Sequence, residues 1–402
     1  MPASTPARGA VMRVAVPGVL IQFAFGLSFV WGAVAPAVSA SAHWSSLALG
    51  AVFSAVPLGY AAGVAVGGWL AERVSPRRLC LVALGVLAGS FMIAFSAPST
   101  VSFVICYSGL GLGVAGGIAL AGTLAAASQL LGHRLGGLAG MLTAAYAGAA
   151  IVEAPIASGM LHVLGWLDVL RILGGFDVLM VALALRWLPG LGAAGGARAE
   201  PSDVSAWALL RSRGLILAGA IEVLGTPVGA YALAHLAVLA KQGGASGAVV
   251  ALTIPAAAIG NTAGRLLSGA ASDRFGANGP LLVVLGAAAL AAAGLAALPL
   301  TTVVVPLGML AGIGFGGPAG LASRLARDSA PHAPHAAFGL VYSAFAFGAF
   351  LGPIIGPPVG GGPRAWALLG GLAAVAFLLA VFRLGRRQTP RFATGGQPRG
   401  GG

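Results

Sequence analysis

Long uninterrupted apolar stretches dominate this chain and leave it few possible folds. A helix that crosses a bilayer needs about 20 mostly apolar residues, and twelve stretches of the chain meet that requirement: 14–38, 48–71, 79–97, 101–130, 136–164, 166–188, 214–240, 247–272, 280–299, 301–323, 336–360 and 364–383. Only 8% of the 402 residues are charged, against about 25% in a soluble domain. The sequence therefore predicts an all-α membrane protein with twelve transmembrane helices.

The basic residues predict how the chain is oriented. With the N-terminus in the cytoplasm, 18 of the 22 Lys and Arg residues fall on the cytoplasmic side and three fall outside. This asymmetry predicts a multi-pass protein of the plasma (inner) membrane with both termini cytoplasmic. It also accounts for the net charge of +13 without a nucleic-acid partner. The two cysteines lie in apolar stretches, so we expect neither a disulfide nor a metal site.

The chain divides into two similar halves. Residues 189–213 form the long polar segment and are predicted to be a cytoplasmic linker between six-helix halves at 1–188 and 214–383, with a basic cytoplasmic tail at 384–402. The segments that begin at Gly68 and Gly269 resemble each other at an offset of 201 residues. A repeat of this kind predicts two pseudo-symmetric halves with a substrate pathway between them.

Two charged motifs carry a resemblance to a known family. Gly68-x-x-x-Glu72-Arg73 followed by Arg77 resembles the loop signature of the major facilitator superfamily, and Gly269-x-x-x-Asp273-Arg274 resembles its second copy. The resemblance implies the major facilitator fold and transport by alternating access. We expect these residues to act as a conformational latch, in which a carboxylate and a guanidinium pair at a helix end. The alternative is that they are ordinary positive-inside charges.

A narrower resemblance concerns the stretch 247–272. Asn261-x-x-x-Arg265 is similar to the monocarboxylate transporter group and to the bacterial oxalate/formate antiporter group, in which such an Arg receives the substrate carboxylate. The stretches around Ser28 and Tyr342 are also similar to these groups. Lysines that those groups carry in the first or eleventh span are missing here, and a single cation suits one carboxylate better than two.

Arg265 is the strongest candidate for substrate recognition. A charge inside a span costs at least about 2.5 kcal/mol on insertion scales, so it is expected to face a cavity or a partner. Its planar fork suits a carboxylate, and Asn261, one turn earlier, can orient it. The alternative is a structural ion pair with a buried acid such as Glu222 or Glu153.

Other residues are candidates for substrate binding or for proton coupling. Side chains that could line a substrate cavity are Tyr342, Phe345, Tyr231, Tyr146, Trp31 and Ser28, although aromatic residues in spans more often serve packing. A carboxyl group in low-dielectric surroundings holds a proton readily, which makes Glu222 and Glu153 candidates for proton coupling. His235 is a third candidate. Helix packing is the alternative for all three.

Together these features predict a proton-coupled transporter of a monocarboxylate such as lactate or pyruvate. The sequence contains no recognisable set of catalytic residues and no phosphate-binding loop, so no cofactor is expected. The expected partners are a small carboxylate, a proton and the lipid bilayer, with the protein acting as a monomer. The alternatives are a drug or metabolite exporter of the same fold with Arg265 structural, an oxalate/formate-type exchanger, and a transporter-shaped sensor.

Overall fold

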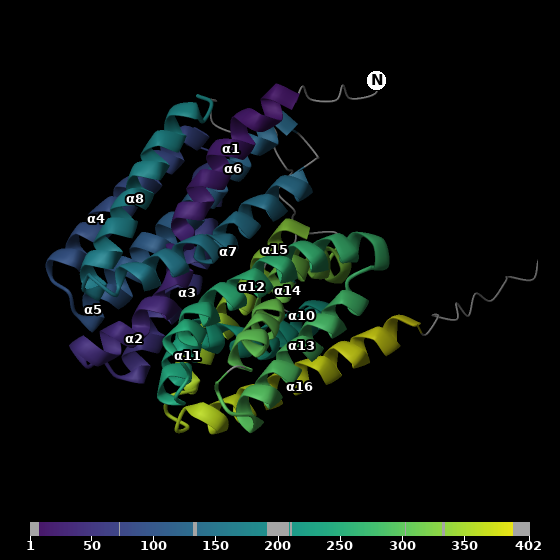
Figure 1. Ribbon diagram of the computed structural model, residues 1–402. Helices are drawn as coiled ribbons and strands as arrows, with labels where there is room; N and C mark the ends of the chain where they lie inside the picture. Colours follow the sequence, from purple (N-terminus) through teal and green to yellow (C-terminus); the bar gives the residue numbers. More distant parts are fainter. Residues whose placement is uncertain are drawn as a thin grey trace, which may run out of the picture.

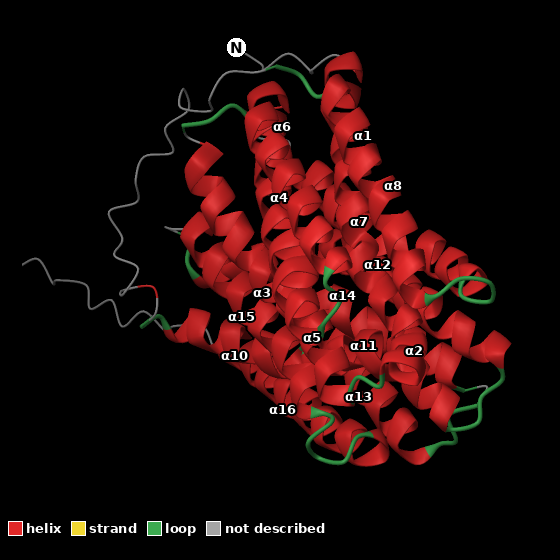
Figure 2. Ribbon diagram, turned by 90° about the vertical axis from the view of Figure 1, so that its left-hand side faces the viewer, coloured by secondary structure: helices red, strands yellow, loops and turns green. Residues whose placement is uncertain are grey.

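Every regular element in the described part of the computed structural model is helical (Figure 2). The described residues are 8–71, 73–131, 135–190, 209, 211–301, 303–331 and 334–388. The first-half elements are α1 Arg8–Phe25, η1 Gly26–Val30, α2 Trp31–Ala42, α3 Ser46–Ala71, α4 Pro76–Ser96, α5 Thr100–Ser102, η2 Phe103–Val114, α6 Ala115–Leu131, α7 Leu135–Met160 and α8 Trp166–Trp187. The second-half elements are α10 Arg213–Gly225, α11 Pro227–Gln242, α12 Gly247–Phe275, α13 Asn278–Ala297, α14 Val304–Ser329, α15 Pro334–Ile355 and α16 Gly362–Gln388.

The predicted all-α membrane fold is confirmed. Within the described residues, 11 helical stretches are long and apolar enough to cross a membrane, and they correspond to predicted spans. The remaining predicted span, 166–188, falls on α8, which has the length but carries several charges. Asp168 and Arg171 pair near one end of this helix at 2.9 Å, whereas Asp177 is buried in its middle at 1% exposure.

Three of the predicted spans are interrupted rather than continuous. The first changes to a 3-10 helix at η1, and the fourth to a π-helix at η2. The seventh breaks at Thr226, because Pro227 has no N–H to continue the ladder. The Thr226 hydroxyl donates to the Glu222 carbonyl at 2.6 Å. Breaks of this kind are typical of transport pathways, where irregular backbone lines a cavity.

The helices form two bundles in chain order, α1 to α8 and α10 to α16 (Figure 1). They meet where α7 packs against α12, α3 against α15 and α2 against α11. The large apolar core of the first bundle includes Leu233, Ile254 and Phe315 from the second. Most of the predicted linker 189–213 and of the predicted tail 384–402 lies outside the described residues.

The two bundles approach closely at the end that carries the α2–α3 connection. Gly50 lies against the Pro353 carbonyl and Gly32 against the Leu233 carbonyl, so that a Cβ at either glycine would overlap backbone. The Ser54 hydroxyl also donates to the Phe350 carbonyl at 2.9 Å. In the predicted orientation this is the outer end of the protein, and here the two halves are closed against each other.

Candidate substrate-binding site between the two halves

Arg265 lies on the long helix α12, which packs against α7 of the first half. Ser246 caps this helix by accepting from the Val249 amide. Glycines on both helices allow α14 to pack tightly on α12: Gly260 lies against the Met309 carbonyl, and Gly316 against the Asn261 carbonyl. This packing fixes the position of α12 and leaves the Arg265 side chain 6% exposed.

Asn261 holds the guanidinium. Its Oδ1 accepts from the Arg265 Nε at 3.0 Å, one helical turn away. The Asn261 side chain is itself buried, and its amide nitrogen has no hydrogen-bond partner in the described part of the chain. The two residues therefore form one polar unit, in which Asn261 holds the Arg265 Nε and has an amide donor with no partner among the described residues.

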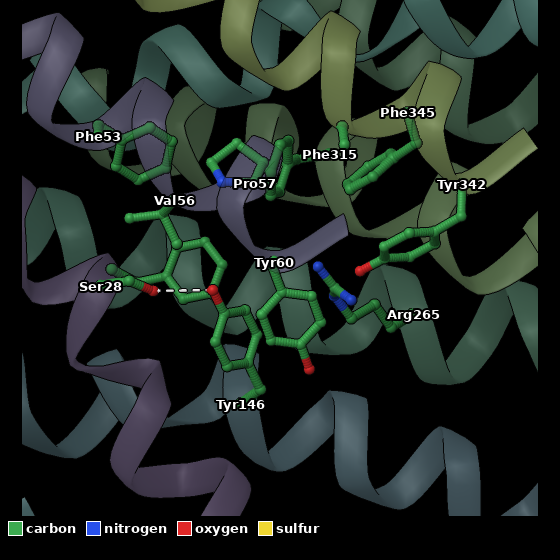
Figure 3. Close-up of a pocket in the computed structure, with 12 residues that line it drawn as sticks. Ser28, Phe53, Val56, Pro57, Tyr60, Tyr146, Arg265, Phe315, Tyr342 and Phe345 are labelled. Carbon is green, nitrogen blue, oxygen red and sulfur yellow. Dashed lines mark hydrogen bonds between the residues drawn. The ribbon is translucent and has the colours of Figure 1, made fainter. Parts of the chain in front are cut away.

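A small cavity lies next to Arg265, between the two bundles (Figure 3). Its walls come from both halves: Ser28, Phe29, Phe53, Val56, Pro57, Tyr60, Tyr146, Arg265, Phe315, Tyr342, Phe345 and Ala346. The volume of this cavity is about 30 Å³, room for about two water molecules. An organic substrate is larger than this, so binding it requires the halves or the aromatic side chains to move apart.

Aromatic rings make up most of the cavity wall. On the first half, the Tyr146 ring packs against Phe29 and Tyr60 at centroid distances of 5.1 Å each. On the second half, the Phe345 ring packs against Phe315 at 5.3 Å and Tyr342 at 5.5 Å. Such rings present apolar faces together with a few hydroxyl groups, a surface suited to a flat or apolar molecule.

The hydroxyl groups are oriented within this wall. The Ser28 hydroxyl donates to the Tyr146 oxygen at 3.0 Å, and the Tyr60 hydroxyl donates to Gln22 Oε1 at 2.8 Å. The Tyr342 hydroxyl points toward the Arg265 guanidinium and interacts with it (Figure 3). Donors from Arg265 and Tyr342 therefore converge on one side of the cavity.

No described acid neutralises Arg265. The ion pairs among described residues are Arg171–Asp168 and Arg324–Asp328. The two acids considered as structural partners are placed elsewhere: Glu153 contacts Asp177, and Glu222 interacts with Arg383 on α16. A buried cation without a counter-ion is costly, and an anionic ligand in the adjacent cavity would remove that cost.

Two of the predicted cavity residues lie outside the cavity. Trp31 is buried in an aromatic cluster with Trp44, Phe103 and Tyr107, and its indole N–H donates to the Leu49 carbonyl at 2.9 Å. Tyr231 packs against Trp366 and His235 at centroid distances of 4.7 and 4.8 Å. In contrast, Ser28, Tyr146, Tyr342 and Phe345 line the cavity together with Arg265.

His235, a predicted proton-coupling residue, lies at the closed end where the two halves meet. A ring nitrogen of His235 is 3.3 Å from the Pro353 carbonyl. On the first half, Gly50 lies next to the ring, since a Cβ at Gly50 would be 2.9 Å from a ring nitrogen of His235. The ring is 3% exposed. This position is at the contact between the bundles and not in the cavity.

The predicted latch residues lie near the ends of α3 and α12. The Arg73 guanidinium stacks 4.1 Å over the Trp69 ring and donates to the Trp69 carbonyl at 3.2 Å. The Arg274 guanidinium lies 5.7 Å from the Phe275 ring. Arg77 and Asp273 are exposed, whereas Gly68 faces open space and Gly269 approaches the Gly320 carbonyl. Glu72 lies outside the described residues.

The sequence analysis missed several residues of the site. Tyr60 packs beside Tyr146 in the cavity wall, and Phe29, Phe53 and Phe315 also line the cavity. Asp177, buried beside Glu153, was also missed. From the sequence, an aromatic residue that lines a cavity in an apolar span cannot be distinguished from one that only packs. A carboxyl in the middle of a span, as at Asp177, can be recognised from the sequence as a candidate functional group.

A helical bundle in two halves, with a cavity between them and a buried cation that has no acidic partner among the described residues, is the arrangement expected of a carrier-type membrane transporter. The family model described as "Major Facilitator Superfamily" matches residues 19–353. The chain therefore belongs to the major facilitator superfamily, whose members are transporters and not enzymes.

Similar proteins agree with this assignment. Over 168 residues, the chain is 32% identical to the 3-(3-hydroxy-phenyl)propionate transporter of Escherichia coli K12, a match that covers 39% of each protein. Among solved structures, the nucleoside transporter NupG matches with a TM-score of 0.69 and 15% identity over 94% of this chain and 99% of that chain. The D-xylose-proton symporter matches at 0.69 and 16%, over 92% and 97%. At these identities the two structures show the shared fold alone.

Proposed function

We propose that this protein is a secondary transporter of monocarboxylates that works by alternating access, with Arg265 binding the carboxylate. The observation that carries the proposal is the buried guanidinium, held by Asn261 at 3.0 Å, without an acidic partner among the described residues and at a cavity between the halves. An anion that binds there forms an ion pair with the Arg265 guanidinium. The two halves can then close over a site whose charges are compensated.

The aromatic wall narrows the class of substrate. The site offers one cation surrounded by aromatic rings. A carboxylate with an apolar or aromatic body fits such a site better than a sugar or a nucleoside, which carries many hydroxyl groups. The partial similarity to a protein named as a hydroxyphenylpropionate transporter supports the same class. Lactate and pyruvate are the smaller members of this class. Proton coupling completes the proposal, because a co-transported proton offsets the charge of the anion.

Ligand-induced thermal stabilisation of the purified protein tests the substrate class. A ligand that binds the folded state raises the melting temperature by mass action. The panel is 3-(3-hydroxyphenyl)propionate, pyruvate, oxalate, a lipophilic cation, and the uncharged amide of the first compound. We expect stabilisation by the monocarboxylates and none by the amide. Stabilisation by the cation alone would contradict the proposal and indicate an exporter, and stabilisation by oxalate alone would indicate a dicarboxylate exchanger.

Tyr342→Phe is expected to weaken carboxylate binding while leaving the fold intact. The change removes the hydroxyl that points toward Arg265 but keeps the ring that packs on Phe345. A hydrogen bond to a charged group contributes about 1.5–3 kcal/mol, so the dissociation constant should rise about tenfold or more. Binding of 3-(3-hydroxyphenyl)propionate measures the effect. The matched control is Tyr231→Phe, whose hydroxyl lies outside the cavity; equal losses in both variants would contradict the assigned role.

A further inference from the structure

A second polar site lies inside the first half, away from the substrate cavity. Glu153 on α7 and Asp177 on α8 are 3% and 1% exposed, and their carboxyl groups contact each other across the two helices. None of the four carboxyl oxygens has a hydrogen-bond donor among the described residues. A contact of this kind is stable only if one carboxyl supplies the donor, so at least one proton is bound between them.

No described cation compensates this pair. Tyr107 on η2 interacts with both carboxyls, and its hydroxyl also has no hydrogen-bond partner in the described part of the chain. Other titratable or charged side chains on α8 and on the helices packed against α7 and α8 are paired or exposed elsewhere. Asp168 pairs with Arg171, Cys80 contacts the Ala119 carbonyl and Arg265 contacts Asn261. The exposed ones are Arg13, Arg77, Arg78, Arg186, Asp273 and Arg274. Two bare charges here would repel each other strongly in low-dielectric surroundings.

The helix that carries Glu153 also reaches the substrate cavity. Tyr146 lines the cavity two turns earlier on α7, about 10 Å along the axis. Pro155, two residues after Glu153, removes one backbone N–H from the helix and permits a local bend. The same helix packs against α12, which carries Arg265. A change in packing between α7 and α8 can therefore move residues that touch the substrate.

We propose that Glu153 and Asp177 together form the proton-binding site that couples this transporter to a proton gradient. One proton is taken up from water on one side of the membrane and forms an O–H bond on one carboxyl. In the closed conformation this O–H group donates a hydrogen bond to the other carboxyl. When the proton leaves to water on the opposite side, two carboxylates remain and repel, which favours the open conformation. The inference rests on the proposed transport function and assigns its coupling site.

Infrared difference spectroscopy of the purified protein tests proton binding without any substrate. A pair that titrates produces a carboxylic acid C=O band that appears as the pH is lowered. We expect this band in the wild type and its loss in both Glu153→Gln and Asp177→Asn. The matched control, Glu222→Gln, removes another buried carboxyl and is expected to keep the band. A band unchanged in both pair variants would overturn the inference.

Proteoliposome transport of 3-(3-hydroxyphenyl)propionate tests coupling. We expect Glu153→Gln and Asp177→Asn to lose accumulation driven by a pH gradient but to keep exchange of labelled for unlabelled substrate, which needs no net proton movement. Gradient-driven accumulation at wild-type level in both variants would overturn the inference. If the wild type neither binds nor exchanges any carboxylate, the proposed function fails instead, while the infrared band still reports on the pair.

Discussion

Arg265→Gln is expected to abolish carboxylate binding and transport while the protein still folds. Glutamine keeps polarity and much of the length but has neither the charge nor the planar fork that pairs with a carboxylate. Loss of one partner from a buried charge pair costs about 2–5 kcal/mol, so affinity should fall about 30-fold or more. The fold should survive, since Arg265 has no described acid partner that its removal would leave unpaired.

Binding of 3-(3-hydroxyphenyl)propionate by titration calorimetry, with uptake into proteoliposomes, measures this effect. The affinity of Arg265→Lys is expected to lie between those of the wild type and Arg265→Gln, because the charge remains but the Nε donor to Asn261 is lost. Lys241→Gln is the matched control, since it removes an exposed cation at the end of α11 that does not line the cavity. Wild-type affinity in Arg265→Gln would show that Arg265 is structural and would favour the exporter interpretation.

Gly50→Val is expected to prevent closure of the end where α3 meets α15. A Cβ at this position would overlap the Pro353 carbonyl and lie 2.9 Å from the His235 ring, and backbone cannot yield as a flexible side chain can. Overpacking of this kind costs about 1–3 kcal/mol, which shifts a two-state equilibrium about 5- to 150-fold. Transport should be strongly reduced because alternating access requires this end to close, whereas substrate binding should persist.

Thiol labelling reports whether this end is open. Ser54→Cys places a thiol at the contact with Phe350, which the closed structure buries. A membrane-impermeant reagent should label it faster in the Gly50→Val background than in the wild-type background. Gly89→Val is the matched control, because nothing lies near a Cβ at that exposed helical position. Unchanged labelling together with normal transport in Gly50→Val would contradict a closure role for this contact.

Several features were predictable because they depend on local composition. A span is recognised from its own apolar residues, since lipid makes the same demand on every membrane helix. Arg265 was recognisable for the same reason, because a charge within such a stretch needs a partner or a cavity. The breaks at η1, η2 and Thr226 were not predicted, because similar Gly- and Pro-containing stretches remain continuous elsewhere, as in α14.

The residues that surround Arg265 could not be predicted as a set. Tyr60, Tyr146 and Phe315 come from three helices in two halves, and their apolar surroundings are the same as those of Tyr231 and Trp31, which pack outside the cavity. Which aromatic residues line a cavity depends on helix rotation, and on close contacts such as that of Gly316 with the Asn261 backbone. Sequence periodicity carries little of that information when helices are apolar on every side.

The sequence by itself determined the membrane class, the helical spans and the unusual position of Arg265, because each follows from the cost of placing charge and backbone in lipid. Only the tertiary structure decided which acid lies beside which group. It separated Glu153 and Glu222 from Arg265, brought Asp177 to Glu153, and left the guanidinium at the cavity. The physical reason is that electrostatic pairing depends on distances across helices, which are set by packing between segments far apart in the chain.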